Sequence, residues 1–180
     1  MRSGRRFVLL DRDGTLVRDP GYVHRIEEYA LLPGVVAALR RLRDAGFAFA
    51  IVTNQGGIGR GLFSEEQYFG FARHLESDLS RQGIRIERTF HCPHGSDAGC
   101  PCRKPAPGLF FRASLELGID LSRSFAVGDA PRDATAALAA GCAGAVRLVG
   151  DERFGASVCE RLAYARDLPG AADRILARPH

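Results

Sequence analysis

Short apolar runs alternate with longer helical patterns along most of this 180-residue chain. The run from Phe7 to Leu10 contains no polar residue, as expected of a strand that is buried on both faces. Comparable runs predict further strands over 47–52, 84–90, 124–127 and 145–149, and the segments between and after them predict helices over 33–46, 64–83, 107–117, 133–140 and 169–178.

Several of the predicted helices carry recognisable signals at their ends. Pro33 stands in the first turn of one helical pattern and Gly46 follows its last turn, which is the usual asymmetry of helix termini. Ser64 and Gln67 have the spacing of a capping box, and Gly83 follows the end of that pattern. These signals support the two helices that separate the first three strands.

The order of the elements predicts the architecture. Strands and helices alternate, apart from a loop rich in cysteine, proline and glycine at 91–106. This order predicts an α/β fold, a Rossmann-like parallel sheet with helices on both faces and therefore three layers. The length suits one domain, and we expect residues 1–180 to form it. In such sheets a ligand binds outside the carboxyl ends of the strands.

Polar residues directly follow three of the predicted strands. Asp11 and Asp13 come after the first strand, Thr53 after the second and Asp129 after the fourth, with Asp133 four residues further on. Clustered carboxylates repel one another unless a cation lies among them, and an all-oxygen cluster suits Mg²⁺. If the first strand continues, Asp11 and Asp13 point the same way, so that one could attack and the other transfer protons. Taken alone, Asp-x-Asp-Gly is equally well an ordinary turn.

The basic residues are almost uniform in type. Lys104 is the only lysine among 25 basic residues, and it stands in the segment Cys-Arg-Lys-Pro. A compact ammonium group can neutralise a phosphoryl group in transfer as a point charge. This position therefore gives a modest indication that arginine is not acceptable there.

Three of the five cysteines lie near a histidine within residues 91–104, a segment that we call the Cys/His loop. Three sulfur atoms and one imidazole form the donor set of a closed tetrahedral zinc site, here Cys92, His94, Cys100 and Cys102. Because no ligand position is left for water, we expect a structural zinc that clamps the segment presenting Arg103 and Lys104. A catalytic zinc is the weaker alternative. Cys142 and Cys159 are expected to be ordinary buried cysteines.

Charge and hydropathy limit the partners and the location. The formal net charge is +4 and the isoelectric point is about 9.0, which is compatible with nucleic acid, an anionic surface or a small phosphorylated substrate. No basic cluster with interleaved aromatic residues is present, so we expect no nucleic-acid partner. The apolar run after the basic N-terminus is too short for a signal peptide or a membrane span. We therefore expect a cytoplasmic protein without a membrane partner, and a monomer.

Four short motifs together resemble those of the haloacid dehalogenase superfamily of phosphohydrolases: DRDGT, TNQ, the Arg-Lys pair and GDxxxD. The closer resemblance is to the D-glycero-D-manno-heptose 1,7-bisphosphate 7-phosphatases. It is carried by the segments LDRDGTLVRDPGYVH, PGV, VTNQGGIGRG, CPH, CxCRKPxPG and VGD, which follow one another in the family's order. The resemblance covers about residues 7–150.

The resemblance implies a reaction and a role for each matching residue. The phosphate at C7 of the heptose bisphosphate would be hydrolysed through an aspartyl-phosphate, in heptose precursor biosynthesis. Asp11 would be the nucleophile, and Asp13 would be the general acid and then the base that activates water. Thr53 and Lys104 would hold the phosphoryl group.

The same resemblance implies two metals and a set of substrate contacts. Mg²⁺ would be bound by Asp11, the carbonyl of Asp13 and Asp129, with Asp133 in support, and the zinc would be structural. No large cap domain interrupts the chain, which fits an open site shaped by short loops. A small phosphorylated sugar would be contacted, besides Thr53 and Lys104, by Asp19, Pro20, Gly21, Tyr22, Asn54, Gln55, Gly56 and Arg103.

Two departures and three rival functions accompany the resemblance. Ala130 stands where family members often carry a lysine that is expected to touch the substrate, and the segment between His94 and Cys100 is short. A histidinol-phosphate phosphatase shares several of the motifs, but the GYVH and GIGRG segments favour the heptose branch. A polynucleotide phosphatase and a zinc-loop binding module without catalysis are weaker alternatives.

Overall fold

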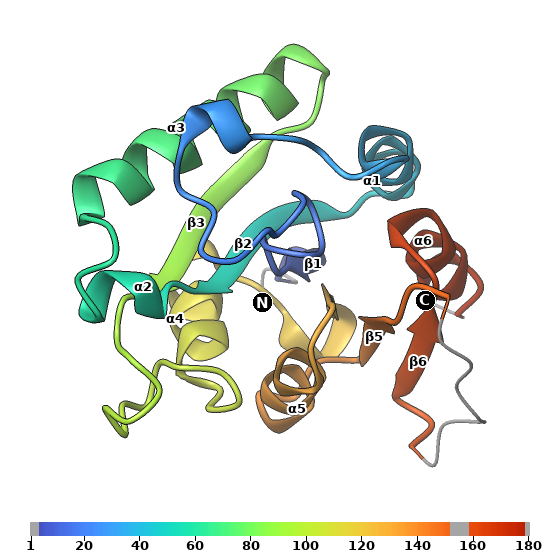
Figure 1. Cartoon of the computed structure of the whole chain (residues 1–180). Helices are drawn as coiled ribbons and strands as arrows, with labels where there is room; N and C mark the ends of the chain where they lie inside the picture. Colours follow the sequence, from blue (N-terminus) through green and yellow to red (C-terminus); the bar gives the residue numbers. More distant parts are fainter. Residues whose placement is uncertain (1–3, 152–158, 179–180) are drawn as a thin grey trace.

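A parallel sheet of six strands forms the centre of the computed structural model, which describes residues 4–151 and 159–178 (Figure 1). The strands lie in the order β3-β2-β1-β4-β5-β6, so the chain order reverses between β1 and β4. Their bounds are Phe7–Leu10 for β1, Ala48–Asn54 for β2, Ile86–Cys92 for β3, Phe125–Gly128 for β4, Gly144–Leu148 for β5 and Leu162–Ala165 for β6. The reversal point is where such sheets bind their ligands.

Helices cover both faces of the sheet. The bounds are Val35–Asp44 for α1, Gly56–Gly59 for α2, Glu65–Arg81 for α3, Gly108–Leu117 for α4, Pro131–Ala139 for α5 and Leu168–Leu176 for α6, with short 3-10 turns at Ile26–Glu28 and Leu121–Arg123. The apolar faces of α1, α3 and α6 share one buried cluster with alternate strand residues. The faces of α4 and α5 share a second cluster on the opposite side of the sheet.

The central strand β1 consists only of apolar residues because both of its faces are buried. Val8 and Leu10 belong to one core cluster, whereas Phe7 and Leu9 belong to the other. Successive side chains of a strand point to opposite faces, so a strand with helices on both sides buries every residue. The predicted three-layer α/β fold is confirmed, and the capping box at Ser64 is present with both of its hydrogen bonds.

Two elements were not predicted from the sequence. The strand β6 is only four residues long and mostly half-buried at the edge of the sheet, so it lacks the apolar run of a central strand. The helix α2 is a single turn of three glycines and one isoleucine, a composition that does not indicate a helix. Among the described residues, none of the helices combines the length and the apolar character needed to cross a bilayer.

Candidate active site and metal centres

Carboxylates from three segments meet at the point where the strand order reverses. Asp11 follows β1, Asp129 follows β4, and Asp133 stands in the first turn of α5. One oxygen from each carboxylate lies within 4.8 Å of the oxygens of the other two. A side chain at residue 14 would overlap the carboxylate of Asp129, and φ there is +72°, so glycine is required on both counts.

Lys104 contacts two of these carboxylates and is almost fully buried. Its Nζ is 2.8 Å from Asp11 Oδ1 and 2.6 Å from Asp133 Oδ1, and it donates a third hydrogen bond to the carbonyl of Val52. Burial alone would lower the pKa of Lys104, but the two carboxylates raise it above its ordinary value. The ammonium group is therefore held charged next to Asp11.

The third carboxylate, Asp129, indicates that the cluster could bind a further positive charge besides Lys104. Burial, together with the charges of Asp11 and Asp133, raises the pKa of Asp129 to about 6. Asp129 Oδ1 is buried and has no hydrogen-bond partner in the described part of the chain. A buried carboxylate oxygen without a donor, beside two further carboxylates, fits an oxygen-ligated divalent cation.

Asp13 occupies a different position from the one expected. The strand β1 ends at Leu10, so Asp13 does not lie in a continuing strand, and the chain turns at Gly14. The side chain of Asp13 is outside the three-carboxylate cluster. It accepts hydrogen bonds from Arg12 Nε at 2.6 Å and from Gln55 Nε2 at 2.8 Å. Only its main-chain carbonyl therefore stays a candidate for the predicted cation contact.

The environment of Asp13 nevertheless suits a proton carrier. Its carboxyl lines the same cavity as Asp11. Burial raises the pKa of Asp13 and the charge of Asp11 adds to that rise, although the Arg12 guanidinium opposes both. A carboxyl group with a raised pKa is more readily found in its protonated form near neutral pH.

Residues at and just after the end of β2 form hydrogen bonds with the predicted phosphoryl-binding residues Thr53 and Lys104. Gln55 Nε2 donates to Thr53 Oγ1 at 3.0 Å. Asn54 forms a pair of hydrogen bonds with the main chain of Lys104, in which its amide donates to the carbonyl and its Oδ1 accepts from the amide, both at 3.0 Å. The TNQ segment therefore fixes the segment that carries the lysine.

These side chains line a cavity of about 280 Å³. The cavity contains nearly every residue that was expected to contact phosphate or sugar; Pro20 lies in the same loop but is exposed and does not line it. Two arginines that were not predicted, Arg60 and Arg132, complete the wall. The lining consists of Asp11, Asp13, Asp19, Gly21, Tyr22, Thr53, Asn54, Gln55, Gly56, Arg60, Arg103, Lys104, Asp129 and Arg132.

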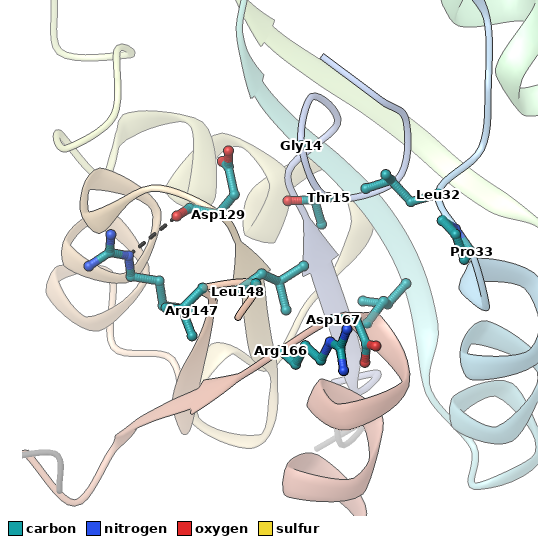
Figure 2. Close-up of a pocket in the computed structure, with 12 residues that line it drawn as sticks. Gly14, Thr15, Leu32, Pro33, Asp129, Arg147, Leu148, Arg166 and Asp167 are labelled. Atoms are coloured by element: carbon teal, nitrogen blue, oxygen red, sulfur yellow. Dashed lines mark hydrogen bonds between the residues drawn. The ribbon is translucent and has the colours of Figure 1, made fainter. Parts of the chain in front are cut away.

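A larger cavity of about 570 Å³ lies on the other side of Asp129. Figure 2 shows the carboxylate of Asp129 directed away from Arg147, whose Nε donates to the main-chain carbonyl of Asp129 at 3.3 Å. Asp129 is the only one of the clustered carboxylates in this wall, which also contains Thr15 and Leu32. Neither Asp11 nor Lys104 lines it, so the smaller cavity is the candidate active site.

The Cys/His loop brings its four predicted zinc ligands together. The three sulfur atoms are 3.3 to 3.6 Å apart, and His94 Nδ1 is 3.5 Å from Cys92 Sγ and 3.2 Å from Cys102 Sγ. A tetrahedral zinc with ligands at about 2.3 Å requires sulfur atoms only slightly further apart than this. The donor set and its spacing therefore fit zinc.

The two remaining cysteines differ from each other. Cys142 is fully buried, as expected, and burial raises the pKa of its thiol to about 12. Cys159 is partly exposed, so the prediction that it is buried is wrong. It precedes β6, the half-buried edge strand that was also missed.

The fold and the site define a class of protein. A parallel sheet carries a carboxylate–lysine cluster at its reversal point, and the model of the haloacid dehalogenase-like hydrolases matches residues 8–141. The chain therefore belongs to the haloacid dehalogenase-like hydrolases.

Two of its sequence relatives carry the name of a heptose bisphosphate phosphatase. The chain is 43% identical over 140 residues to the D-glycero-beta-D-manno-heptose-1,7-bisphosphate 7-phosphatase of Yersinia pestis, which is 74% of this chain and 74% of that protein. It is 39% identical over 140 residues to the protein of the same name from Escherichia coli K12, which is 74% of this chain and 73% of that protein.

A solved structure agrees with these sequence relatives. The crystal structure of a D,D-heptose 1,7-bisphosphate phosphatase from B. bronchiseptica, complexed with magnesium and phosphate, superposes with a TM-score of 0.83. The two chains are 32% identical, and the match covers 95% of this chain and 98% of the other.

Proposed function

We propose that this chain is a Mg²⁺-dependent phosphatase that hydrolyses the C7 phosphate of D-glycero-D-manno-heptose 1,7-bisphosphate, in heptose precursor biosynthesis. The observation that carries the proposal is the buried Asp11–Lys104 pair, which lies in the wall of the smaller cavity. The similarity to heptose bisphosphate phosphatases supports the choice of substrate. The cytoplasmic location and the monomeric state stay predictions.

The first chemical step is attack by Asp11. One oxygen of Asp11 accepts a hydrogen bond from Lys104, and the carboxylate has a second oxygen with which to attack phosphorus. The ammonium group of Lys104 offsets the negative charge that gathers on the phosphoryl oxygens. The sugar oxygen leaves with a proton from Asp13, whose raised pKa favours the protonated form.

The second step returns the enzyme to its starting state. Asp13, now ionised, accepts a proton from the water that attacks the aspartyl-phosphate, so inorganic phosphate leaves and Asp11 is restored. The covalent intermediate divides one difficult hydrolysis into two easier steps. Thr53, whose Oγ1 accepts a hydrogen bond from Gln55, would donate its hydroxyl proton to the phosphoryl group.

Two metals belong to the proposal. When bound by Asp11, the carbonyl of Asp13 and Asp129, with Asp133 in support, Mg²⁺ would supply positive charge that screens the phosphate from the attacking carboxylate. Zn²⁺ bound by the four ligands of the Cys/His loop would have a structural role. That loop ends at Arg103 and Lys104, so a metal there would hold both side chains in the cavity wall.

The substrate carries a second phosphate, so we expect positively charged side chains in the cavity away from the reacting phosphate. Arg103 donates one hydrogen bond to the carbonyl of His94 and Arg132 is exposed, and within the described residues neither forms an ion pair with a carboxylate. Both line the cavity. We assign the binding of the second phosphate to Arg103 and Arg132. Ala130, which stands where family members often carry a lysine, has no charge with which to contribute.

The proposal is tested by comparing substrates. Purified protein with Mg²⁺ should release phosphate from both anomers of the heptose bisphosphate far faster than from histidinol phosphate, and chelation of Mg²⁺ should abolish release. Asp11→Asn should lose turnover while it stays folded and keeps its zinc. A preference for histidinol phosphate by orders of magnitude would reject the heptose assignment, and full activity of Asp11→Asn would reject the mechanism.

A further inference from the structure

Three segments that are distant in sequence meet at one side chain on the rim of the cavity. Arg60 directly follows α2, and its Nη1 donates to Tyr22 Oη at 2.7 Å, while its Nη2 donates to Ser96 Oγ at 2.9 Å. Tyr22 belongs to residues 19–24, which we call the rim loop, and Ser96 belongs to the Cys/His loop. One guanidinium therefore connects both loops to the end of α2.

The rim loop holds an unusual conformation that needs support. Tyr22 has a φ of +54°, a region that residues other than glycine rarely adopt. Within the loop, Asp19 Oδ1 accepts from the amide of Gly21 at 2.8 Å, and His24 Nδ1 lies 2.7 Å from the carbonyl of Tyr22. These local bonds shape the loop but do not fix it to the rest of the protein.

The rim loop is anchored at Val23, which is fully buried in the core and whose carbonyl accepts a hydrogen bond from Arg12 at 2.8 Å, and two further contacts join its exposed side chains to the segment after β2. The hydroxyl of Tyr22 accepts from Arg60, and the ring of His24 stacks on Phe63 with 4.7 Å between the centroids. Phe63 is itself fixed, because its ring lies where a side chain at Gly57 would be. Arg60 and Phe63 therefore hold the side chains of Tyr22 and His24, on either side of the buried Val23.

The same segment is packed directly on the Cys/His loop. The amide of Gly59 donates to the carbonyl of Pro93 at 2.8 Å, and a side chain at Gly59 would lie 2.8 Å from that oxygen. The backbones approach this closely because the helix is built from glycines. Arg60 extends the contact from the Cys/His loop to the rim loop.

We propose that Arg60 is a positioning residue, which couples the Cys/His loop to the rim loop and so sets the affinity for the sugar part of the substrate. The inference rests on the proposed function and explains the GYVH and GIGRG segments, which the phosphoryl chemistry does not use. Asp19, Gly21 and Tyr22 line the cavity, whereas none of the hydrogen bonds of Arg60 reaches Asp11 or Lys104. Substrate binding should therefore depend on the bridge and phosphoryl transfer should not.

Ser96 provides the sharpest test, because it does not line the cavity and can affect the substrate only through its neighbours. Ser96→Ala should raise KM for the heptose bisphosphate about threefold to tenfold, the effect of one net hydrogen bond. It should leave kcat unchanged, and also the hydrolysis of p-nitrophenyl phosphate, which has no sugar part. Ser96→Thr keeps the hydroxyl and should retain the wild-type KM.

A variant of Arg60 itself and a proteolysis measurement test the same proposal independently. Arg60→Met should raise KM at least as much as Ser96→Ala, and the double variant should be no worse than Arg60→Met. Trypsin should cleave both single variants faster after Arg18 and Arg25, which flank the rim loop, and this measurement needs no turnover. The zinc content of each variant serves as the control for the Cys/His loop.

The outcomes separate the two proposals. A wild-type KM and wild-type cleavage rates for both variants, on an enzyme that does hydrolyse the heptose bisphosphate, would overturn the role of Arg60 and leave the proposed function intact. Equal losses on the sugar substrate and on p-nitrophenyl phosphate would also overturn it, because they would place Arg60 in the chemistry. A wild-type enzyme that cleaves small esters but not the heptose bisphosphate would reject both.

Discussion

Replacement of Lys104 by methionine should cause a large loss of stability as well as of activity. The Lys104 side chain is 1% exposed and lies 2.8 Å from Asp11 Oδ1 and 2.6 Å from Asp133 Oδ1. It also donates to the carbonyl of Val52 at 2.7 Å. Methionine has a similar length but no donor, so two buried carboxylates and one carbonyl lose their partner while the packing is largely kept.

The size of the loss follows from the burial of the partners. Removal of one member of a buried ion pair costs about 3–5 kcal/mol, because the other charge stays buried without compensation. Burial raises the pKa of Asp133 and Lys104 lowers it, so without the lysine Asp133 takes up a proton more readily, which offsets more of the loss as the pH falls. We therefore expect the unfolding free energy to drop by about 3–5 kcal/mol at pH 8 and by less at pH 5.

The measurement is urea unfolding of metal-free protein, followed by far-ultraviolet circular dichroism because the sequence contains no tryptophan. Arg85→Met is the matched control, since its side chain is 83% exposed and its ion pair with Glu87 should contribute less than about 1 kcal/mol. An unfolding midpoint of Lys104→Met equal to that of wild type, or a deficit that grows as the pH falls, would refute this reasoning.

Three further predictions concern positions away from the catalytic cluster. Tyr29→Phe removes a hydroxyl that lowers the pKa of Asp78 below its ordinary 3.8, so urea melts should show a loss of about 1 kcal/mol at pH 7 that fades as the pH falls below 4. Gly57→Ala, whose methyl group would overlap a phenylalanine ring, should lower stability by about 1–3 kcal/mol, whereas Gly70→Ala, with open space around it, should not destabilise; equal melting temperatures would contradict this. Cys142, with its pKa raised to about 12, should react with a thiol reagent only on unfolding, as peptide mapping can show.

The parts of the fold and of the site that could be predicted from the sequence are those with a single local physical cause. The apolar run of β1 requires burial on both faces, and the carboxylates that follow β1 and β4 meet because parallel strands end at one edge. The four ligands of the Cys/His loop are close in sequence, so their meeting was also predictable. The side-chain partners of Asp13 were not, because Gln55 is 42 residues away in the sequence and the strand ends before Asp13.

Other parts of the site depend on tertiary packing that leaves no local signal. Arg60 and Arg132 are two of many arginines, and only the folded chain shows that both line the cavity. The helix α2 forms because glycines allow close contact with the Cys/His loop and with Phe63, although glycine disfavours helices in general. The strand β6 is added at an edge where three of its four residues stay partly exposed, so its composition is not distinctive.

The proposed mechanism requires that Asp11 accepts the phosphoryl group during turnover. An acid quench of the enzyme during a single turnover of the heptose bisphosphate with Mg²⁺, followed by mass spectrometry of its peptides, tests this most directly. We predict that the peptide containing Asp11 gains the mass of one phosphoryl group, and that Asp11→Asn gains none. Turnover without any phosphorylated peptide, or the same added mass in Asp11→Asn, would contradict this mechanism.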